Sequence, residues 1–305
     1  MEFLYLLEKI RMPWLDQIML TVTHLGEETA FLAIGIVLFW CVDKYYGYYL
    51  MGVGLFGNLI NQFLKILCRV PRPWVRDPNF HPLEAAIKEA GGYSFPSGHS
   101  QTAVGTFGCI AATQKNWILR AVCIVLMILV PVSRMYVGVH TPADVLVGSA
   151  MALLMVAGFY PLMLGNGKKN IPWVFASLLL LSIAYVLYVE LYPFSADVDQ
   201  ENLTSAIKNG YTFVGCFAGL IVVYFADEKK FHFETKAIWW AQILKAVLGL
   251  GAVLAVKEGT RGILDTIFAG HFAARSVRYF LVVIVAGIVW PLTFRWFSKM
   301  GKKEQ

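Results

Sequence analysis

Charged residues are scarce in this chain of 305 residues. Only 15% of the residues are Asp, Glu, Lys or Arg, and 58% are hydrophobic, whereas a soluble domain has about 25% charged and 45–50% apolar residues. The mean hydropathy is +0.60. The apolar residues fall in blocks of about 17–25, the length of helix that crosses a bilayer. The composition excludes an ordinary soluble domain, and we expect an integral, multi-pass membrane protein.

Cysteine is also scarce, and its spacing matches neither a disulfide framework nor a zinc site. Internal repeats and low-complexity tracts are absent from the sequence. Nothing in the sequence suggests a metal or a cofactor, and we interpret the cysteines as small core residues. All five lie in or at the ends of apolar blocks: Cys41, Cys68, Cys109, Cys123 and Cys216.

The first eighteen residues lack the apolar core and small-residue cleavage site of a signal peptide. Glu8, Lys9 and Arg11 interrupt the apolar run, and Pro13 breaks it. This segment is too charged to span a bilayer, and its pattern is typical of a helix lying in the membrane interface.

What the chain does have is nine apolar blocks. They are continuous and do not alternate with polar residues, which favours helices over barrel strands. We predict an all-α fold, a polytopic transmembrane helix bundle of about nine spans with an interfacial N-terminal helix. The expected spans are Leu20–Trp40, Tyr45–Cys68, His99–Gln114, Ile118–Val137, Thr141–Leu164, Ile171–Val189, Gly210–Ala226, Ala237–Val256 and Val277–Phe297.

A polar turn at residues 165–169 divides the chain into a first part, residues 1–165, and further helices in residues 166–305. The distribution of Lys and Arg between loops predicts a cytoplasmic C-terminus, with the polar clusters described next on the outer side of the plasma membrane. The net charge of +6 fits contact with anionic membrane lipids. We expect no nucleic-acid partner, and the oligomeric state stays open.

The first polar cluster ends the second predicted span. Lys65 completes a polar stripe on one helical face, which normally turns toward the interior of a bundle. Arg72 follows between Pro71 and Pro73, which stiffen the chain. The alternative is that Lys65 extends toward the interface and Arg72 anchors there. The stripe consists of Asn58, Asn61, Gln62 and Lys65.

The second cluster, Pro96-Ser97-Gly98-His99, opens the third predicted span. Ser97 is a favourable N-cap, and Gly98 lets the backbone approach a ligand closely. The free N–H groups of a helix start form an anion site. His99 beside that anion could donate a proton to a leaving oxygen. The alternative interpretation is an ordinary cap with an interfacial histidine.

The third cluster joins the fourth and fifth predicted spans. Arg134 offers a planar fork for phosphoryl oxygens. Asp144 lies four residues after His140, close enough to accept a hydrogen bond from Nδ1 and leave Nε2 free as a nucleophile. Asp144 also has a structural explanation, because Thr141 to Asp144 matches a variant capping box. Three cations, two histidines and a carboxylate are the groups needed to hold and transfer a phosphoryl group.

These three clusters resemble the signature of the type-2 phosphatidic acid phosphatase superfamily, which includes lipid phosphate phosphatases, glucose-6-phosphatase and vanadium haloperoxidases. The resemblance implies that His140 attacks phosphorus and forms a phosphohistidine, that Asp144 orients it, and that His99 protonates the leaving group and later activates water. It also implies a metal-independent hydrolase. The residues that would bind the phosphate are Lys65, Arg72, Ser97, Gly98 and Arg134, with Ser133 in support.

The expected function is hydrolysis of a lipid phosphate or diphosphate, such as phosphatidate, phosphatidylglycerol phosphate or a polyprenyl diphosphate. A sugar-phosphate phosphatase of the glucose-6-phosphatase type is an alternative suggested by the count of nine spans. A lipid phosphotransferase and a non-enzymatic lipid transporter are further alternatives. Vanadate, a mimic of five-coordinate phosphorus, should inhibit the enzyme.

Overall fold

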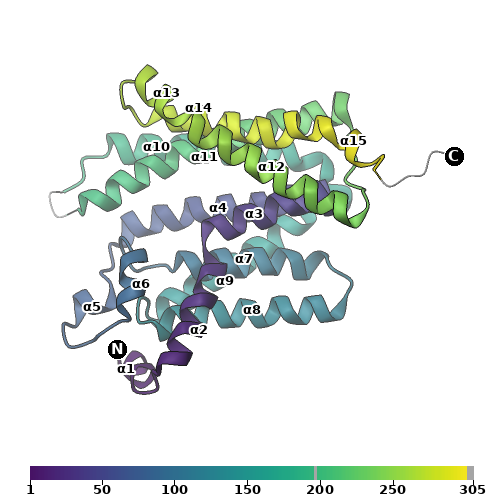
Figure 1. The fold of residues 1–305 in the computed structure, drawn as a ribbon. Helices are drawn as coiled ribbons and strands as arrows, with labels where there is room; N and C mark the ends of the chain where they lie inside the picture. Colours follow the sequence, from purple (N-terminus) through teal and green to yellow (C-terminus); the bar gives the residue numbers. More distant parts are fainter. Residues whose placement is uncertain (196–197, 301–305) are drawn as a thin grey trace. The chain divides into compact units, whose positions relative to one another are not determined.

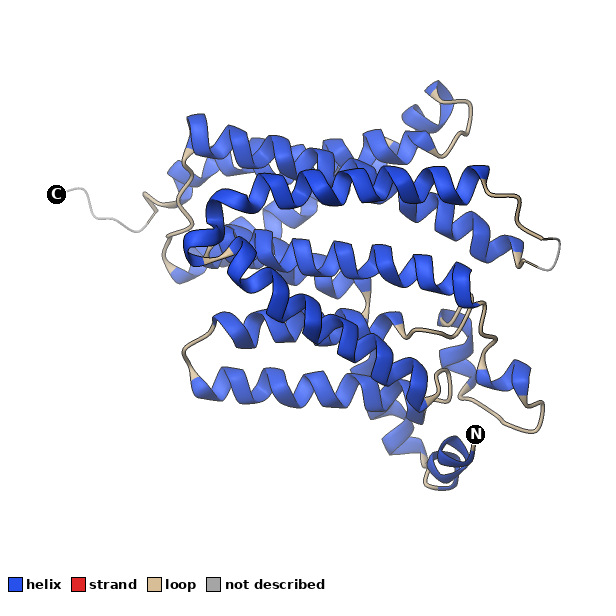
Figure 2. Ribbon diagram, turned by 180° about the vertical axis from the view of Figure 1, so that it is seen from behind, coloured by secondary structure: helices blue, strands red, loops and turns tan. Residues whose placement is uncertain are grey.

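The computed structural model describes residues 1–195 and 198–300. Within this part of the chain every element is a helix (Figures 1 and 2), which confirms the predicted all-α bundle. The α-helices are α1 (Glu2–Lys9), α2 (Pro13–Thr23), α3 (Glu28–Val37), α4 (Lys44–Cys68), α5 (Pro73–Arg76), α6 (Glu84–Glu89), α7 (Gly98–Thr113), α8 (Trp117–Tyr136), α9 (Pro142–Met163), α10 (Ile171–Leu191), α11 (Gln200–Ala226), α12 (Trp239–Gly259), α13 (Arg261–Ile267), α14 (Ala273–Ile284) and α15 (Phe294–Phe297).

The described part of the chain has seven helical segments long and apolar enough to cross a membrane, or eight if one bent pair forms a single span. The protein is therefore a multi-pass membrane protein, but the count of nine spans is not confirmed. Two of the predicted spans account for the difference: the first, which is the bent pair, and the third, α7, whose 16 residues extend about 24 Å at 1.5 Å per residue, less than the apolar core of a typical bilayer.

The predicted first span, Leu20–Trp40, is not one straight helix. The chain bends by 56° between Pro13–Gly26 and Glu28–Val42. A single 3₁₀ turn at His24–Gly26 separates α2 from α3. Residues 20–23 belong to the helix that Pro13 begins, because proline at the first helical position lacks only an N–H that has no partner there.

The chain divides into two compact units. The first consists of Met1–Leu32, Val53–Tyr160 and Pro193–Ala206, and the second of Ala33–Gly52, Pro161–Tyr192 and Ile207–Gln305. Both α3 and α4 pass from one unit to the other. The boundary predicted at residue 165 stays a prediction.

The centre of the first unit is α7, which lies antiparallel to α8 (Figure 1). Every residue of α7 from Ser100 to Cys109 is buried. The helix lacks bulky side chains over most of its length, so neighbouring helices can approach it closely. Its N-terminus, with Ser97 as the cap, therefore lies inside protein.

Aromatic side chains fill the second unit. The indole of Trp40 donates to the carbonyl of Ala286 over 2.8 Å, and Tyr48 packs against Phe175 and Tyr224.

The five cysteines are free thiols, and three of them are buried. Cys41 is half-buried and Cys68 is exposed, so the interpretation of Cys68 as a core residue is wrong, because α4 ends there.

Candidate active site

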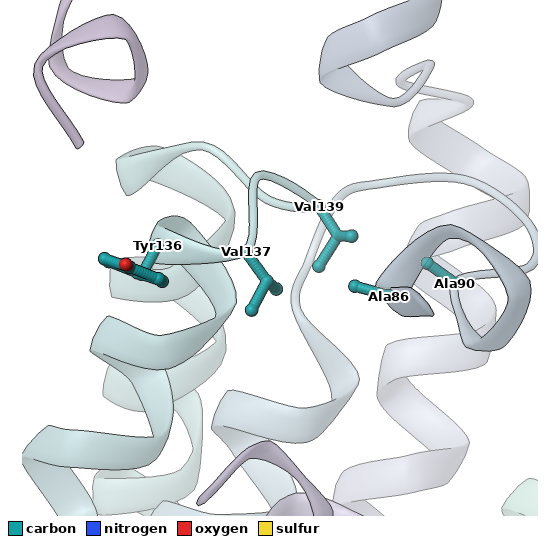
Figure 3. Packing of buried hydrophobic residues seen from close by; sticks show 5 residues of the cluster. All are labelled: Ala86, Ala90, Tyr136, Val137 and Val139. Atoms are coloured by element: carbon teal, nitrogen blue, oxygen red, sulfur yellow. The ribbon is translucent and has the colours of Figure 1, made fainter. Parts of the chain in front are cut away.

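A short loop between α8 and α9 carries His140, and its residues pack against α6. Val137 and Val139 are buried with Ala86 of α6 and Ala90, the residue that follows α6 (Figure 3). The amide of Leu83 also donates to the carbonyl of Val137 over 3.0 Å. Apolar contacts on both sides of residue 138 thus fix the backbone immediately before the histidine.

Gly138 makes this tight turn possible. Its φ is +86°, and a Cβ there would lie 2.9 Å from both Arg11 Nη2 and Phe80 Cζ. Residues other than glycine rarely adopt such a backbone angle. Arg11 donates to the carbonyl of Tyr136 from Nε over 3.1 Å and from Nη2 over 3.0 Å, and to the carbonyl of His81. The N-terminal segment thereby holds the loop before His140.

The imidazole of His140 is buried, with 1% of the residue exposed. Nη1 of Arg72 lies 3.0 Å from Nε2 of His140. A guanidinium can only donate hydrogen bonds. Nε2 must therefore be the acceptor, with a lone pair, and the ring proton must lie on Nδ1. This is the tautomer that an imidazole needs to attack through Nε2.

Ser94 connects the other ring nitrogen to Asp144. Its Oγ donates to Oδ2 of Asp144 over 2.6 Å and lies 3.4 Å from Nδ1 of His140. Nδ1 is 3.6 Å from Oδ2 of Asp144, which is beyond ordinary hydrogen-bond length. The expected direct hydrogen bond is therefore not formed, and the serine hydroxyl lies within reach of both groups.

Asp144 also caps α9, as the capping-box interpretation predicts. The amide of Thr141 donates to Oδ2 over 2.7 Å, and the amide of Asp144 lies 3.4 Å from the Thr141 hydroxyl. The structural and functional interpretations of Asp144 are therefore compatible, because one carboxylate serves both contacts. The cap fixes the carboxylate that lies behind the imidazole.

The surroundings of His140 disfavour its protonated form. Burial lowers its pKa well below the usual value, and the positive charges of Arg72, Arg134 and Lys65 lower it further. His140 is therefore a neutral imidazole at pH 7. Of these cations, Arg72 contacts the ring directly, with Nη1 3.0 Å from Nε2.

Arg72 holds two loops together in this structure. Nε donates to the carbonyl of Gly92 over 2.8 Å and Nη2 to Gly91 over 2.7 Å, while Nη1 donates to Val139 over 3.0 Å. The loop at residues 91–93 is fixed in turn by Asn202, whose Oδ1 accepts from the amide of Tyr93 over 3.0 Å. Arg72 thus has a structural function in addition to any contact with phosphate.

The second cluster meets the third directly. The amide of Ser97 donates to the main-chain carbonyl of Asp144 over 3.0 Å. Ser97 caps α7, as predicted, through the contact between its Oγ and the amide of Ser100 over 3.4 Å. Asn61 of α4, in the predicted polar stripe, donates to the carbonyl of Pro96 over 3.3 Å. Residues from α4, α7 and α9 therefore converge at the start of α7.

Two glycines let neighbouring helices approach this cluster. A Cβ on Gly148 would lie 2.6 Å from the carbonyl oxygen of Ser97, and one on Gly26 would lie 2.8 Å from that of His99. Gly98 itself is more open, since its nearest neighbour would be Asn61 Oδ1 at 3.6 Å. The backbone on either side of Gly98 is therefore closely packed, by α9 at Ser97 and by the turn at Gly26 at His99.

The remaining predicted residues differ in what they contact. Arg134 is buried and donates from Nη1 to the hydroxyl of Thr23 over 2.7 Å. Ser133 is buried as well, but its hydroxyl donates to the carbonyl of Val130 over 2.7 Å. Ser133 therefore supports the end of α8, while Arg134 is held by α2.

Three residues of this site were missed by the sequence interpretation: Ser94, Thr23 and Arg11. Ser94 lies in a loop without periodic hydropathy, so the sequence pattern gave no indication that it belongs to the site. Thr23 precedes its partner Arg134 by 111 positions. Arg11 was noted only as a charge that prevents the first segment from spanning. A buried arginine at the end of a span requires a fixed partner, but the sequence does not say which residue supplies it.

In the described residues, no group of three His, Cys, Asp or Glu side chains is arranged to hold a metal ion. The prediction of a metal-independent reaction stays a prediction. The groups around His140 are instead cations and hydrogen-bond donors, which suit an anion with several oxygens.

Comparison with known proteins defines the class. The PAP2 superfamily pattern matches residues 45–168, and that of the transmembrane extension of PAP2 superfamily phosphatases matches residues 211–303. The chain is therefore a membrane-embedded phosphatase, a hydrolase of phosphate esters. Phosphatidylglycerophosphatase B of Bacillus subtilis (strain 168) is 32% identical over 168 residues, covering 49% of this chain and 77% of that protein. With this match, the chain belongs to the PAP2 superfamily, as the resemblance of its three clusters predicted.

Other relatives are more distant or shorter in coverage. Sphingosine-1-phosphate phosphatase 1 of Mus musculus is 24% identical over 250 residues, covering 77% of this chain and 57% of that protein. Undecaprenyl-diphosphatase BcrC of Bacillus subtilis (strain 168) is 30% identical over 106 residues, covering 35% of this chain and 51% of that protein. The crystal structure of a transmembrane PAP2 type phosphatidylglycerolphosphate phosphatase from Bacillus subtilis is 30% identical, covers 51% of this chain and 81% of that one, and has a TM-score of 0.44.

Proposed function

We propose that this protein hydrolyses a phosphate or diphosphate group on a lipid through a phosphohistidine at His140. The observation that carries the proposal is the state of His140: its Nε2 has a lone pair facing Arg72, while Nδ1 faces Ser94 and Asp144. A buried, neutral imidazole held in this tautomer is prepared to attack phosphorus.

The proposed reaction has two steps. In the first, Nε2 of His140 forms a bond to phosphorus while the bond from phosphorus to the lipid oxygen breaks, and His99, protonated once the negative phosphate lies beside it, gives that oxygen its proton. In the second, His99 accepts a proton from water, whose oxygen attacks phosphorus and breaks the N–P bond. The negative charge on the phosphoryl oxygens is stabilised in both steps by a set of cations and donors: Lys65, Arg72, Ser97, Gly98 and Arg134.

Arg72 must change its contacts when substrate binds. Its Nη1 occupies the side of the imidazole from which phosphorus would approach. A phosphoryl oxygen can replace Nε2 as the acceptor for that N–H group, so the guanidinium keeps a hydrogen bond and the lone pair becomes free. The same cation thus protects the nucleophile in the empty site and binds the phosphate in the occupied one.

A lipid substrate is supported by the setting of the site and by the relatives. The loop with His140 lies between two helices that are long and apolar enough to span a membrane, Trp117–Tyr136 and Pro142–Met163, where a lipid would present its phosphate. The relatives are named for three different lipid phosphates or diphosphates. The sugar-phosphate alternative was based on nine spans, and that count is not confirmed.

Location and orientation belong to the same proposal. A plasma-membrane enzyme with its site on the extracytoplasmic face and its C-terminus in the cytoplasm agrees with the distribution of Lys and Arg between loops. Labelling of single introduced cysteines from either side of the membrane, in a cysteine-free background, would test it.

The test of function is release of inorganic phosphate by the purified protein in detergent micelles. The substrates are phosphatidate, phosphatidylglycerol phosphate, sphingosine 1-phosphate, undecaprenyl diphosphate and glucose 6-phosphate, and the control is His140→Gln. We expect turnover of at least one lipid, no turnover by the control, and inhibition by vanadate. Cleavage of glucose 6-phosphate alone, or transfer of label to a second lipid without free phosphate, would contradict the proposal.

A further inference from the structure

A second polar site lies in the second unit, outside the residues assigned to catalysis. A cavity of about 490 Å³ opens between the chain that follows α11 and the C-terminal residues, a volume within the usual range for a ligand site. Phe233, Pro291 and Phe294 are buried and form its apolar floor. Lys230 and Arg295 are exposed at its rim.

The chain that forms one wall is fixed by a buried carboxylate. Asp227 pairs with Lys44, accepts a hydrogen bond from the amide of Phe233 over 2.9 Å, and its carbonyl accepts from the amide of His232 over 2.9 Å. His232 has a φ of +44°, a conformation that few side chains adopt without such support. The wall therefore has a defined shape.

The opposite wall is supported by a buried lysine. Nζ of Lys245 lies 4.4 Å from the centre of the Phe294 ring and donates to the carbonyl of Thr235 over 2.9 Å. Lys245 thereby connects the residue that forms the floor to the segment that forms the first wall. The cavity is pre-formed, and this reduces the entropic cost of filling it.

The charges around the cavity favour an anion. Its lining includes two cations, Lys230 and Arg295, and one acidic residue, Glu234, and the nearby Asp227 is already paired with Lys44. A cationic rim above an aromatic floor suits a molecule that has a phosphate at one end and hydrocarbon at the other. Glu234 can in addition accept a hydrogen bond from a hydroxyl group next to that phosphate.

The position in the chain points to a membrane lipid. The first wall connects the candidate spans Gln200–Phe231 and Trp239–Ile267, so the cavity lies where the bilayer meets water. We propose that this cavity binds the headgroup of an anionic phospholipid, with its phosphate between Lys230 and Arg295. The proposal gives a binding function to the segment matched by the transmembrane-extension pattern, residues 211–303, and it does not depend on the proposed catalytic function.

The experiment measures binding of phosphatidylglycerol to the full-length protein by native mass spectrometry in detergent. The cavity variant is Lys230→Gln with Arg295→Gln. The matched control is Lys169→Gln with Lys229→Gln, which removes two exposed lysines of the same unit outside the cavity. His140→Gln shows whether the lipid instead occupies the candidate active site.

We expect the cavity variant to bind phosphatidylglycerol about tenfold or more weakly, since two charge-assisted hydrogen bonds are lost. The matched control and His140→Gln should bind like the wild type, and phosphatidylcholine should bind weakly to all four. Equal binding by the cavity variant and its control would overturn the proposal, and so would loss of binding in His140→Gln. Displacement of the lipid by an equal concentration of glycerol 3-phosphate would show a site for soluble phosphate and contradict a lipid.

Discussion

At the scale of single residues, one hydroxyl group decides how the imidazole of His140 is held. Asp144 lies 3.6 Å from Nδ1, too far for a normal hydrogen bond. Ser94 donates to the carboxylate over 2.6 Å and lies 3.4 Å from Nδ1. Ser94 therefore positions the imidazole and the carboxylate, and we propose that it affects the reaction only through these two groups.

We predict that Ser94→Ala lowers kcat by about 10- to 100-fold, because a hydrogen bond to a charged group contributes about 1.5–3 kcal/mol. KM should change by less than about threefold, since this hydroxyl does not bind phosphate in the proposed site. Steady-state kinetics on the preferred lipid measures both constants.

The control for this variant is Ser182→Ala in α10. Ser182 is equally buried and donates to the carbonyl of Leu178 over 2.8 Å, so its loss tests the effect of removing any buried serine hydroxyl. It should leave kcat near the wild-type value. A Ser94→Ala enzyme with wild-type kcat, or with a change in KM alone, would show that the hydroxyl does not position His140.

At the scale of elements, the site depends on how closely α9 passes the start of α7. A Cβ on Gly148 would overlap the carbonyl oxygen of Ser97 at 2.6 Å, whereas one on Gly158 of the same helix would meet nothing within 4 Å. Both glycines lie in α9, so they share secondary structure and differ in what they face. They form a matched pair for testing the position of the loop at residues 96–98, which we propose binds phosphate.

Gly148→Ala should reduce kcat/KM by about 100-fold, because a displacement near 1 Å at a reacting site has this effect. Gly158→Ala should keep wild-type kinetics, and its midpoint of thermal unfolding should be equal or slightly higher, because alanine has the greater helix propensity. Equal kinetics for the two variants would mean that the loop does not need support from α9.

Sequence patterns predicted a helix well where its position follows from the hydropathy of the residues. The caps at Ser97 and Thr141 were predicted because their side-chain chemistry is local. The break at His24–Gly26 was not, since hydropathy continues through it and the close approach of Gly26 to His99 depends on tertiary packing. The bounds of α7 were predicted to within a residue at each end, but its crossing of the membrane is not confirmed, because a helix buried by other helices need not be long enough to cross the bilayer.

The candidate site also contains residues that the sequence predicted and residues that it did not. Its charged residues were found because charge at the ends of apolar spans is unusual and needs a reason. Ser94 and Thr23 were not found, because a hydroxyl in a polar setting is common and its partner lies far away in sequence. The sequence predicted the groups that we propose to contact the phosphate, and the structure adds the groups that hold some of them, such as Thr23 for Arg134.

At the scale of the whole molecule, burial of a neutral His140 makes folding sensitive to acid. The pKa of His140 is well below 6.5 in the folded protein and returns to about 6.5 on unfolding. Below pH 6.5 the unfolded chain therefore binds a proton that the folded protein does not. The free energy of unfolding then falls by up to about 1.4 kcal/mol for each pH unit.

We predict that the midpoint of thermal unfolding of the wild type in detergent falls more steeply between pH 7 and pH 5.5 than that of His140→Gln, which lacks this titration. Above pH 7 the difference between the two proteins should stay constant, since His140 is neutral in both states. Parallel curves over the whole range would contradict a folded-state pKa below the usual value.

The central claim is that His140 becomes covalently phosphorylated. The most direct measurement uses the preferred lipid labelled with ³²P in the scissile phosphate, an alkaline quench within the first turnover, and mapping of the label by peptide mass spectrometry. The account predicts an acid-labile, base-stable label on His140 in the wild type and none in His140→Gln. Label on another residue, or undiminished labelling of the His140→Gln protein, would contradict it.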